Sequence, residues 1–145
     1  MPLVEKAFAY VTRGGRLLVF DHVEYPEAGL QVPGGTIDPG ESPRAAVLRE
    51  AEEETGLSAF GEPRPLGVVE FDAREVGRDE VHRRHFFHLP LLEEAPERWR
   101  HHEMHDSGGG GPVEYELYWM PIDEAARRLA RGHGSLLAEL TRVRA

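Results

Sequence analysis

The sequence contains no cysteine and no asparagine, and it has one lysine beside 16 arginines. The absence of cysteine excludes disulfide frameworks, thiolate nucleophiles and metal sites with sulfur ligands. No apolar run approaches the roughly 18 residues of a transmembrane helix, and the N-terminal residues lack the pattern of a secretion signal. We therefore expect a cytoplasmic protein with no membrane partner.

Positive charge is also scarce, because 17 basic and 26 acidic side chains give a formal net charge of −9. Such a surface repels the phosphate backbone, so general nucleic-acid binding is not expected. An excess of carboxylates can still serve a phosphorylated substrate when divalent cations lie between the two. The length of 145 residues predicts a single domain over residues 1–145.

Turn and cap residues divide the chain into alternating strand and helix candidates. Strands are expected at 7–11, 16–20, 30–32, 65–71, 82–89 and 115–120. Helices are expected at 43–55, 121–131 and 135–142. The glycine-rich segment after residue 32 and the stretch 93–112 are expected to be loops.

The helix at 43–55 carries the clearest chemical pattern. Ser42 is suited to cap its first turn, and Gly56 is suited to end it in a left-handed conformation. At about 100° per residue, Glu50, Glu53 and Glu54 share one arc of the helix surface. We expect no basic residue within that arc, so the carboxylates repel one another unless a divalent cation binds them. Magnesium suits such a site because it prefers oxygen ligands and bridges to substrate phosphates.

The pattern extends beyond this helix in both directions. Gly35 is followed after five residues by Glu41, and after seven more by the run Arg49-Glu50-Ala51-Glu52-Glu53-Glu54-Thr55-Gly56-Leu57. This stretch, from Gly35 to Leu57, matches the signature box of the Nudix hydrolases at every fixed position, and the order of elements around it resembles the Nudix fold. The resemblance implies an α/β (α+β) fold of the αβα sandwich type with a mixed central sheet.

The resemblance also implies a function. The protein would be a divalent-metal-dependent pyrophosphohydrolase that cleaves a phosphoanhydride bond in a nucleoside diphosphate linked to another moiety. Catalytic and metal-binding roles for Mg²⁺ or Mn²⁺ would fall to Glu50, Glu53 and Glu54, with the Gly34 carbonyl as a further metal ligand. Glu50 is one candidate for the general base, and that role stays open. Structural roles in the box would fall to Gly35, Glu41, Arg49 and Gly56.

Many Nudix enzymes place a further catalytic glutamate in a loop before the last strand. Here Glu103 is the preferred candidate over Glu93, Glu94 and Glu114. We expect it to lie on a mobile flap at 99–112, because four consecutive glycines follow it.

Other chemistry-bearing residues have two interpretations. His101, His102 and His105 could ligate zinc or belong to an exposed loop, and the loop is favoured because their spacing fails the metalloprotease pattern. Arg83 and Arg84 could contact substrate phosphates or form surface ion pairs. Tyr115 is expected to pack on its strand rather than to stack on a base.

An alternative function is a non-catalytic Nudix-fold module that binds a nucleotide or a protein partner. The intact box argues against it, since a binding-only module would be expected to lose ligand glutamates. The sequence does not identify the substrate-binding residues or the nucleoside diphosphate derivative, and it leaves a homodimer open.

Overall fold

The structure is a computed structural model that describes residues 1–103 and 113–144, with side chains as far as residue 140. Its strands are β1 (Leu3–Arg13), β2 (Arg16–His22), β3 (Gly34–Thr36), β4 (Arg64–Asp72), β5 (Val81–Pro90), β6 (Arg98–Glu103) and β7 (Val113–Pro121). Its α-helices are α1 (Pro43–Thr55), α2 (Ile122–Arg128) and α3 (Leu137–Arg144), and short 3-10 helices occupy Pro26–Ala28 and Ala73–Val76.

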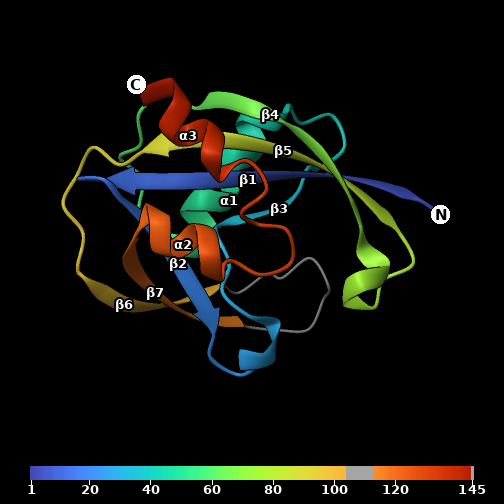
Figure 1. The fold of residues 1–145 in the computed structure, drawn as a ribbon, viewed down its shortest axis with the longest axis horizontal. Helices are drawn as coiled ribbons and strands as arrows, with labels where there is room; N and C mark the ends of the chain where they lie inside the picture. Colours follow the sequence, from blue (N-terminus) through green and yellow to red (C-terminus); the bar gives the residue numbers. More distant parts are fainter. Residues whose placement is uncertain (104–112, 145) are drawn as a thin grey trace.

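The described strands form one mixed sheet in the order β4-β5-β1-β2-β7-β6, with β3 paired to β1 (Figure 1). β1 and β5 run parallel, and the other neighbouring strands run antiparallel. β1 and β2 pair next to their connecting turn, whereas residues 6–8 of β1 pair with β3. After β2 the chain returns to the first half of β1 and pairs with it as β3. This pairing brings Gly34 and Gly35 into the sheet.

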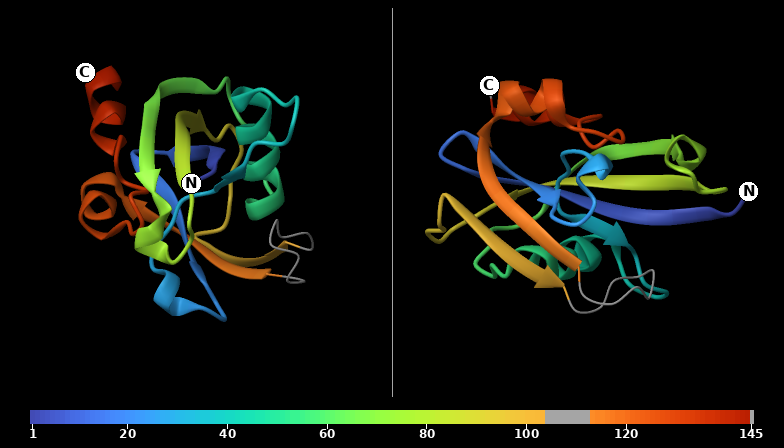
Figure 2. Two further views of the ribbon diagram at one scale, coloured as in Figure 1. Left: turned by 90° about the vertical axis from the view of Figure 1, so that its right-hand side faces the viewer. Right: turned by 90° about the horizontal axis from the view of Figure 1, so that it is seen from below.

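Helices cover both faces of this sheet, with α1 on one side and α2 and α3 on the other (Figure 2). Successive residues of a strand point to opposite faces, so β1 contributes to two hydrophobic clusters. Ala9 belongs to the cluster that contains Val47 of α1, and Tyr10 belongs to the cluster that contains Leu140 of α3. The expected αβα sandwich with a mixed sheet is confirmed.

Local sequence signals explain the first hairpin and the first helix. Gly14 and Gly15 have φ angles of 59° and 79°, which glycine adopts without steric penalty in a two-residue turn. Ser42 accepts a hydrogen bond from the Ala45 amide at the start of α1, and Gly56 ends the helix with a φ of 77°. The predicted helix 43–55 is confirmed at both ends.

Two predictions about the segment before α1 are wrong. Residues 30–32 form isolated bridges rather than a strand, in which Gln31 pairs with Phe20 and Leu30 pairs with Leu129. The glycine segment, expected to be a loop, instead forms β3. Gly34 and Gly35 lie opposite Phe8 and Ala7 of β1 in this pairing.

The prediction of a loop over 93–112 is confirmed for residues 93–97 and wrong for residues 98–103, which form β6. This strand pairs with β7 along its whole length. Arg98 and Arg100 form ion pairs with Glu116 across the two strands, which favours pairing of these polar segments. The proposed flap at 99–112 is therefore incorrect for residues 99–103, and its remaining part lies outside the described residues, as does His105.

The C-terminal helices are shorter or displaced relative to the prediction. α2 ends at Arg128 because Leu129 leaves the helix to pair with Leu30, and α3 begins at Leu137 rather than at residue 135. None of the helices in the described part of the chain combines the length and apolar character needed to cross a bilayer.

Tyr10 links the C-terminal segment to the sheet. Its buried hydroxyl donates to the His133 carbonyl at 2.7 Å and accepts from the Leu136 amide at 3.2 Å. Tyr10→Phe should lower the free energy of unfolding by about 1–3 kcal/mol, because both backbone groups lose a buried partner. Tyr25→Phe, at an exposed tyrosine, is the control and should change it by less than about 0.5 kcal/mol in denaturant titrations. Equal small effects would contradict this role for Tyr10.

Candidate active site

The glutamates of α1 divide by their position around the helix. Glu50 and Glu54 are buried, whereas Glu52 and Glu53 are exposed. Glu50, Glu53 and Glu54 line one cavity of about 480 Å³ and Glu52 does not, which agrees with the helical phase inferred from the sequence. The carboxylate face of α1 is therefore directed into a cavity rather than into bulk solvent.

Glu103 reaches the same cavity from β6 and is 9% exposed. One carboxylate oxygen from each of Glu50, Glu53 and Glu103 lies within 4.8 Å of the others. The other candidates lie elsewhere, since Glu93 faces the Ser58 amide at 3.4 Å and Glu114 pairs with His102 at 2.9 Å. Of the glutamates considered outside the box, the structure brings Glu103 to the carboxylates of α1.

The glycines of β3 allow α1 to approach closely. A Cβ atom on Gly35 would lie 2.5 Å from the carboxyl carbon of Glu50, a separation that real Cβ atoms do not tolerate. The Gly34 amide donates a hydrogen bond of 2.6 Å to Glu54. A side chain at residue 35 would therefore displace the Glu50 carboxylate, and residue 34 fixes the second buried carboxylate through its backbone.

Arg49 connects the loop before α1 to the glutamate cluster. Its guanidinium donates two bonds of 2.8 Å to Glu41 and one of 3.1 Å to the Thr36 carbonyl. The same group contacts Glu50 at 2.9 Å and Glu53 at 3.4 Å. The expectation that no basic residue relieves the glutamate arc is thus wrong, because the long Arg49 side chain reaches it from the adjacent helix position.

Relief by Arg49 is incomplete, as the pKa values of the buried carboxyls show. Burial raises the pKa of Glu50 to about 7, and the Glu103 and Glu53 charges add to this effect while Arg49 opposes it. Burial and the nearby Glu50 and Glu103 charges raise the pKa of Glu54 well above its ordinary value. The Arg49 bond instead holds the pKa of Glu41 at about 2. Negative charge is therefore unfavourable inside the cavity.

Tyr115 is a site residue that the sequence reasoning missed. Its hydroxyl donates a 2.8 Å hydrogen bond to Glu103, and burial together with the Glu54 and Glu103 charges raises the tyrosine pKa. Strand alternation predicts an inward side chain at this position. Nothing in the sequence indicates that its partner is a carboxylate on the neighbouring strand.

His101 and His102 lie on strand β6 rather than in the expected loop, and His102 is exposed. The ring Nε2 of His101 lies 2.8 Å from the Glu53 carbonyl, one of the last carbonyls of α1. The last carbonyls of an α-helix have no hydrogen-bond partner within the helix, so the His101 ring is suited to donate to the Glu53 carbonyl. His102 lies on β6 and pairs with Glu114.

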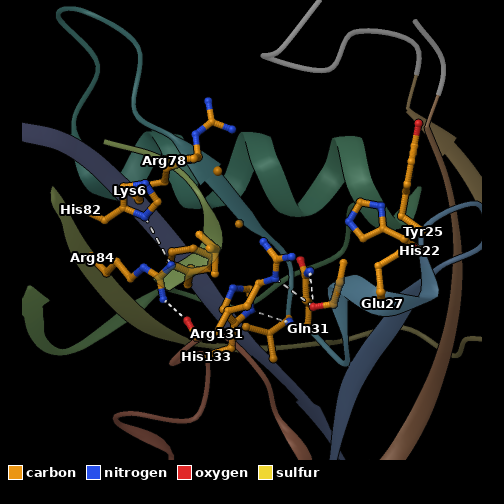
Figure 3. A pocket seen from close by; sticks show the side chains of 16 residues that line it. Lys6, His22, Tyr25, Glu27, Gln31, Arg78, His82, Arg84, Arg131 and His133 are labelled. Carbon is orange, nitrogen blue, oxygen red and sulfur yellow. Dashed lines mark hydrogen bonds between the residues drawn. The ribbon is translucent and has the colours of Figure 1, made fainter. Parts of the chain in front are cut away.

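A second cavity of about 450 Å³ adjoins the first and shares His22, Gly34 and Gly35 with it. Figure 3 shows its lining side chains. Arg84 lines this cavity, whereas Arg83 pairs with Glu5 at 3.3 Å and Glu70 at 3.5 Å. Adjacent strand positions face opposite sides of the sheet, so the two arginines of the sequence pair have separate surroundings.

The carboxylate cavity has the donor chemistry of a divalent-cation site. Its grouped ligand atoms are the carboxylate oxygens of Glu50, Glu53 and Glu103, which Mg²⁺ and Mn²⁺ favour. At Gly35 the β3 backbone lies close to the Glu50 carboxylate, in space that a side chain would occupy. The residues present therefore fit such a cation.

Comparison with known families agrees with this geometry. The model of the NUDIX domain family matches residues 3–140. The chain belongs to the Nudix hydrolase family. This Nudix chain is 34% identical over 93 residues to the CTP pyrophosphohydrolase of Escherichia coli strain K12, a match covering 62% of the chain and 64% of that relative.

A further curated relative is the CMP-5'-(N-acetyl-N-hydroxy-3-aminopropyl)phosphonate hydrolase of Streptomyces rubellomurinus. It is 33% identical over 110 residues, which covers 72% of the Nudix chain and 43% of the relative. Both matches span less than two thirds of the relative's own length.

Solved structures support the fold. A NUDIX hydrolase from Nitrosomonas europaea superposes with a TM-score of 0.67 at 23% identity, covering 99% of this chain and 89% of that one. A MutT NUDIX hydrolase from Burkholderia pseudomallei gives a TM-score of 0.66 at 23% identity, covering 97% and 99%. At this identity the likeness concerns the fold alone.

The raised pKa of Glu50 predicts a pH-dependent stability. Between its ordinary value of 4.5 and about 7, the folded protein holds a proton at Glu50 that the unfolded chain has lost. Ionisation of Glu50 therefore destabilises the metal-free fold as pH rises through this window. As pH rises through this window, the free energy of unfolding of the neutral variant Glu50→Gln should increase relative to that of the wild type by up to about 3 kcal/mol.

Denaturant titrations in chelator at several pH values measure this difference. Glu52→Gln is the matched control on the exposed side of α1, and its difference from the wild type should be flat with pH. A flat difference for Glu50→Gln would show that the cavity does not disfavour its charge.

Proposed function

We propose that this Nudix chain is a divalent-metal-dependent pyrophosphohydrolase that cleaves a phosphoanhydride bond in a nucleoside diphosphate derivative. The observation that carries the proposal is the approach of Glu50, Glu53 and Glu103 oxygens to within 4.8 Å of one another. Carboxylates at such distances repel one another when they are ionised, a divalent cation would remove that repulsion, and phosphoanhydride hydrolysis uses such a cation.

Glu50, Glu53 and Glu103 would hold Mg²⁺ or Mn²⁺, with Glu54 and the Gly34 carbonyl as further candidate ligands. The bound cation would supply positive charge that neutralises the phosphate oxygens of the substrate. The other contributions come from the chain itself. Arg49 holds Glu50 and Glu53 in place, and the Tyr115 hydroxyl orients Glu103.

Proton transfer is the second requirement. When water attacks phosphorus and the phosphoanhydride P–O bond breaks, a base must accept the proton that the water loses. In the metal-free protein burial raises the pKa of Glu50 to about 7, so this carboxyl can hold a proton near neutral pH. We assign this role to Glu50, with Glu103 as the other carboxylate positioned to accept a proton.

The nucleotide part of the substrate class is supported by two curated relatives, a CTP pyrophosphohydrolase and a hydrolase of a CMP phosphonate. The non-catalytic binding module remains the alternative. It predicts nucleotide binding without hydrolysis when Mg²⁺ or Mn²⁺ is present. A cytoplasmic location and a homodimer stay predictions from the sequence.

The decisive comparison is between two glutamates outside the box. Glu103→Gln should lower kcat by at least about 10²-fold, as expected for a lost acid–base or positioning group, because Glu103 lies within the carboxylate cluster. Glu93→Gln, at a glutamate outside that cavity, should have little effect. Phosphate release from a panel of nucleoside triphosphates, dinucleoside polyphosphates and sugar nucleotides measures both.

The wild type should also lose activity in chelator and regain it on addition of Mg²⁺ or Mn²⁺. Equal, small effects of the two substitutions would reject the role of Glu103. Nucleotide binding with no hydrolysis of any panel member would favour the binding module.

A further inference from the structure

The second cavity gathers positive charge in a protein whose net charge is −9. Lys6, Arg78, His82 and Arg84 cluster at one end of it, whereas His22, Tyr25 and Glu27 lie at the other end (Figure 3). We call the first group the basic end. Arg78 and His82 pair with Glu80, whereas Arg84 does not form the surface ion pair that is one interpretation of its sequence.

Arg84 is the most informative residue of the basic end. It is 3% exposed, and its guanidinium lies 3.8 Å from the centre of the Phe71 ring. It donates to the Arg131 carbonyl, yet its Nε has no hydrogen-bond partner. No carboxylate of the described residues forms an ion pair with it, and burial lowers its pKa to about 10. A buried cation in this condition is costly unless an anion binds it.

Lys6, the only lysine of the chain, lies in the same cavity. No ion pair joins it to a carboxylate of the described residues. Burial and the charge of Arg78 lower its pKa. Arg78 itself is partly neutralised by Glu80 at 3.4 Å, so the uncompensated charge is concentrated on Lys6 and Arg84.

His133 adds a further donor to this cavity. Its Nδ1 accepts a 3.1 Å hydrogen bond from the Val32 amide, so the neutral ring carries its proton on Nε2. Burial lowers the pKa of His133 well below its ordinary value, which keeps the ring neutral. The His82 ring is already engaged, by Arg84 at 3.3 Å and by Glu80 at 2.6 Å. Lys6, Arg84 and His133 are therefore the groups of this cavity that suit a ligand with several oxygen acceptors.

We propose that the basic end, through Lys6 and Arg84, binds an anionic phosphate or carboxylate group of the substrate that is separate from the diphosphate undergoing hydrolysis. The proposal rests on the proposed function and specifies its substrate class, a nucleoside diphosphate derivative with an additional anionic group. The two cavities share His22, Gly34 and Gly35, so one extended molecule can occupy both.

The first experiment measures anion binding without catalysis. Because Lys6 is the only lysine, acetylation of its amine can be followed by mass spectrometry in metal-free protein, with the N-terminal amine as internal reference. Inorganic phosphate should slow acetylation of Lys6 selectively. Arg84→Met should abolish this protection. Arg83→Met should retain it, because Arg83 faces the opposite side of the same strand.

The second experiment uses substrate pairs that differ by one anionic group. UDP-glucuronate and UDP-glucose differ by a carboxylate, and NADP⁺ and NAD⁺ differ by a phosphate. With Mg²⁺, the wild type should prefer the anionic member of at least one pair by about tenfold or more in kcat/KM, the size expected of a charge-assisted hydrogen bond. The preferred pair identifies the group as carboxylate or phosphate.

Arg84→Met should lower kcat/KM for the anionic member, so that the ratio of the two kcat/KM values in the pair approaches one. Arg83→Met should leave this ratio unchanged. Lys6→Met, at a half-buried position, is a second variant in case loss of the Arg84 contacts prevents folding. Equal losses for both members of a pair would mean that the basic end binds the common diphosphate, and would overturn the proposal. The proposal would also be overturned if inorganic phosphate did not slow the acetylation of Lys6.

Failure of the proposed function gives a different result. If the wild type hydrolyses no member of either pair or of the wider nucleotide panel, that function is rejected. Protection of Lys6 by phosphate, and its loss in Arg84→Met, then decides the anion site independently.

Discussion

The carboxylates of Glu50, Glu53 and Glu103 repel one another at the short distances that α1 and β6 impose. This repulsion is the constraint on which the arrangement around the site depends. Burial is the larger cause of the raised pKa values of Glu50 and Glu54, and this repulsion adds to it, while Arg49 offsets part of the repulsion by pairing with Glu50 and Glu53. A divalent cation would convert the same repulsion into attraction, since all three side chains offer it oxygen ligands.

The fold holds this unfavourable cluster in place through contacts outside it. Ser42 and Gly56 fix the two ends of α1, and the Glu41–Arg49 pair fastens the preceding loop to its middle. β3 brings Gly34 and Gly35 against α1, where a side chain at position 35 would displace the Glu50 carboxylate. Pairing of β6 with β7 then brings Glu103 and Tyr115 together across the two strands. β3 also lies between the two cavities, because Gly34 and Gly35 line both of them.

Features set by local chemistry could be predicted from the sequence. α1 was predicted at both ends because its cap residues act within one turn, and the glutamate phase follows from helical geometry. β6 could not be predicted, because its polar residues gain their stability from cross-strand partners on β7. Arg83 and Arg84 show the same limit: they are neighbours of identical type, yet one forms surface ion pairs and the other is buried. What distinguishes them is the set of residues packed against each face of the sheet, which lie far away in the sequence.

The most direct test of the account is a calorimetric titration of the metal-free protein with Mn²⁺ near pH 6.5, in two buffers of different ionisation enthalpy. At that pH the pKa of about 7 leaves Glu50 largely protonated. A cation bound by the carboxylate cluster must displace that proton, so each bound cation should release about one proton, and more if it also binds Glu54. Glu52→Gln should behave as the wild type. Binding with no proton release, or no binding at all, would contradict the assignment of this cluster as a cation site.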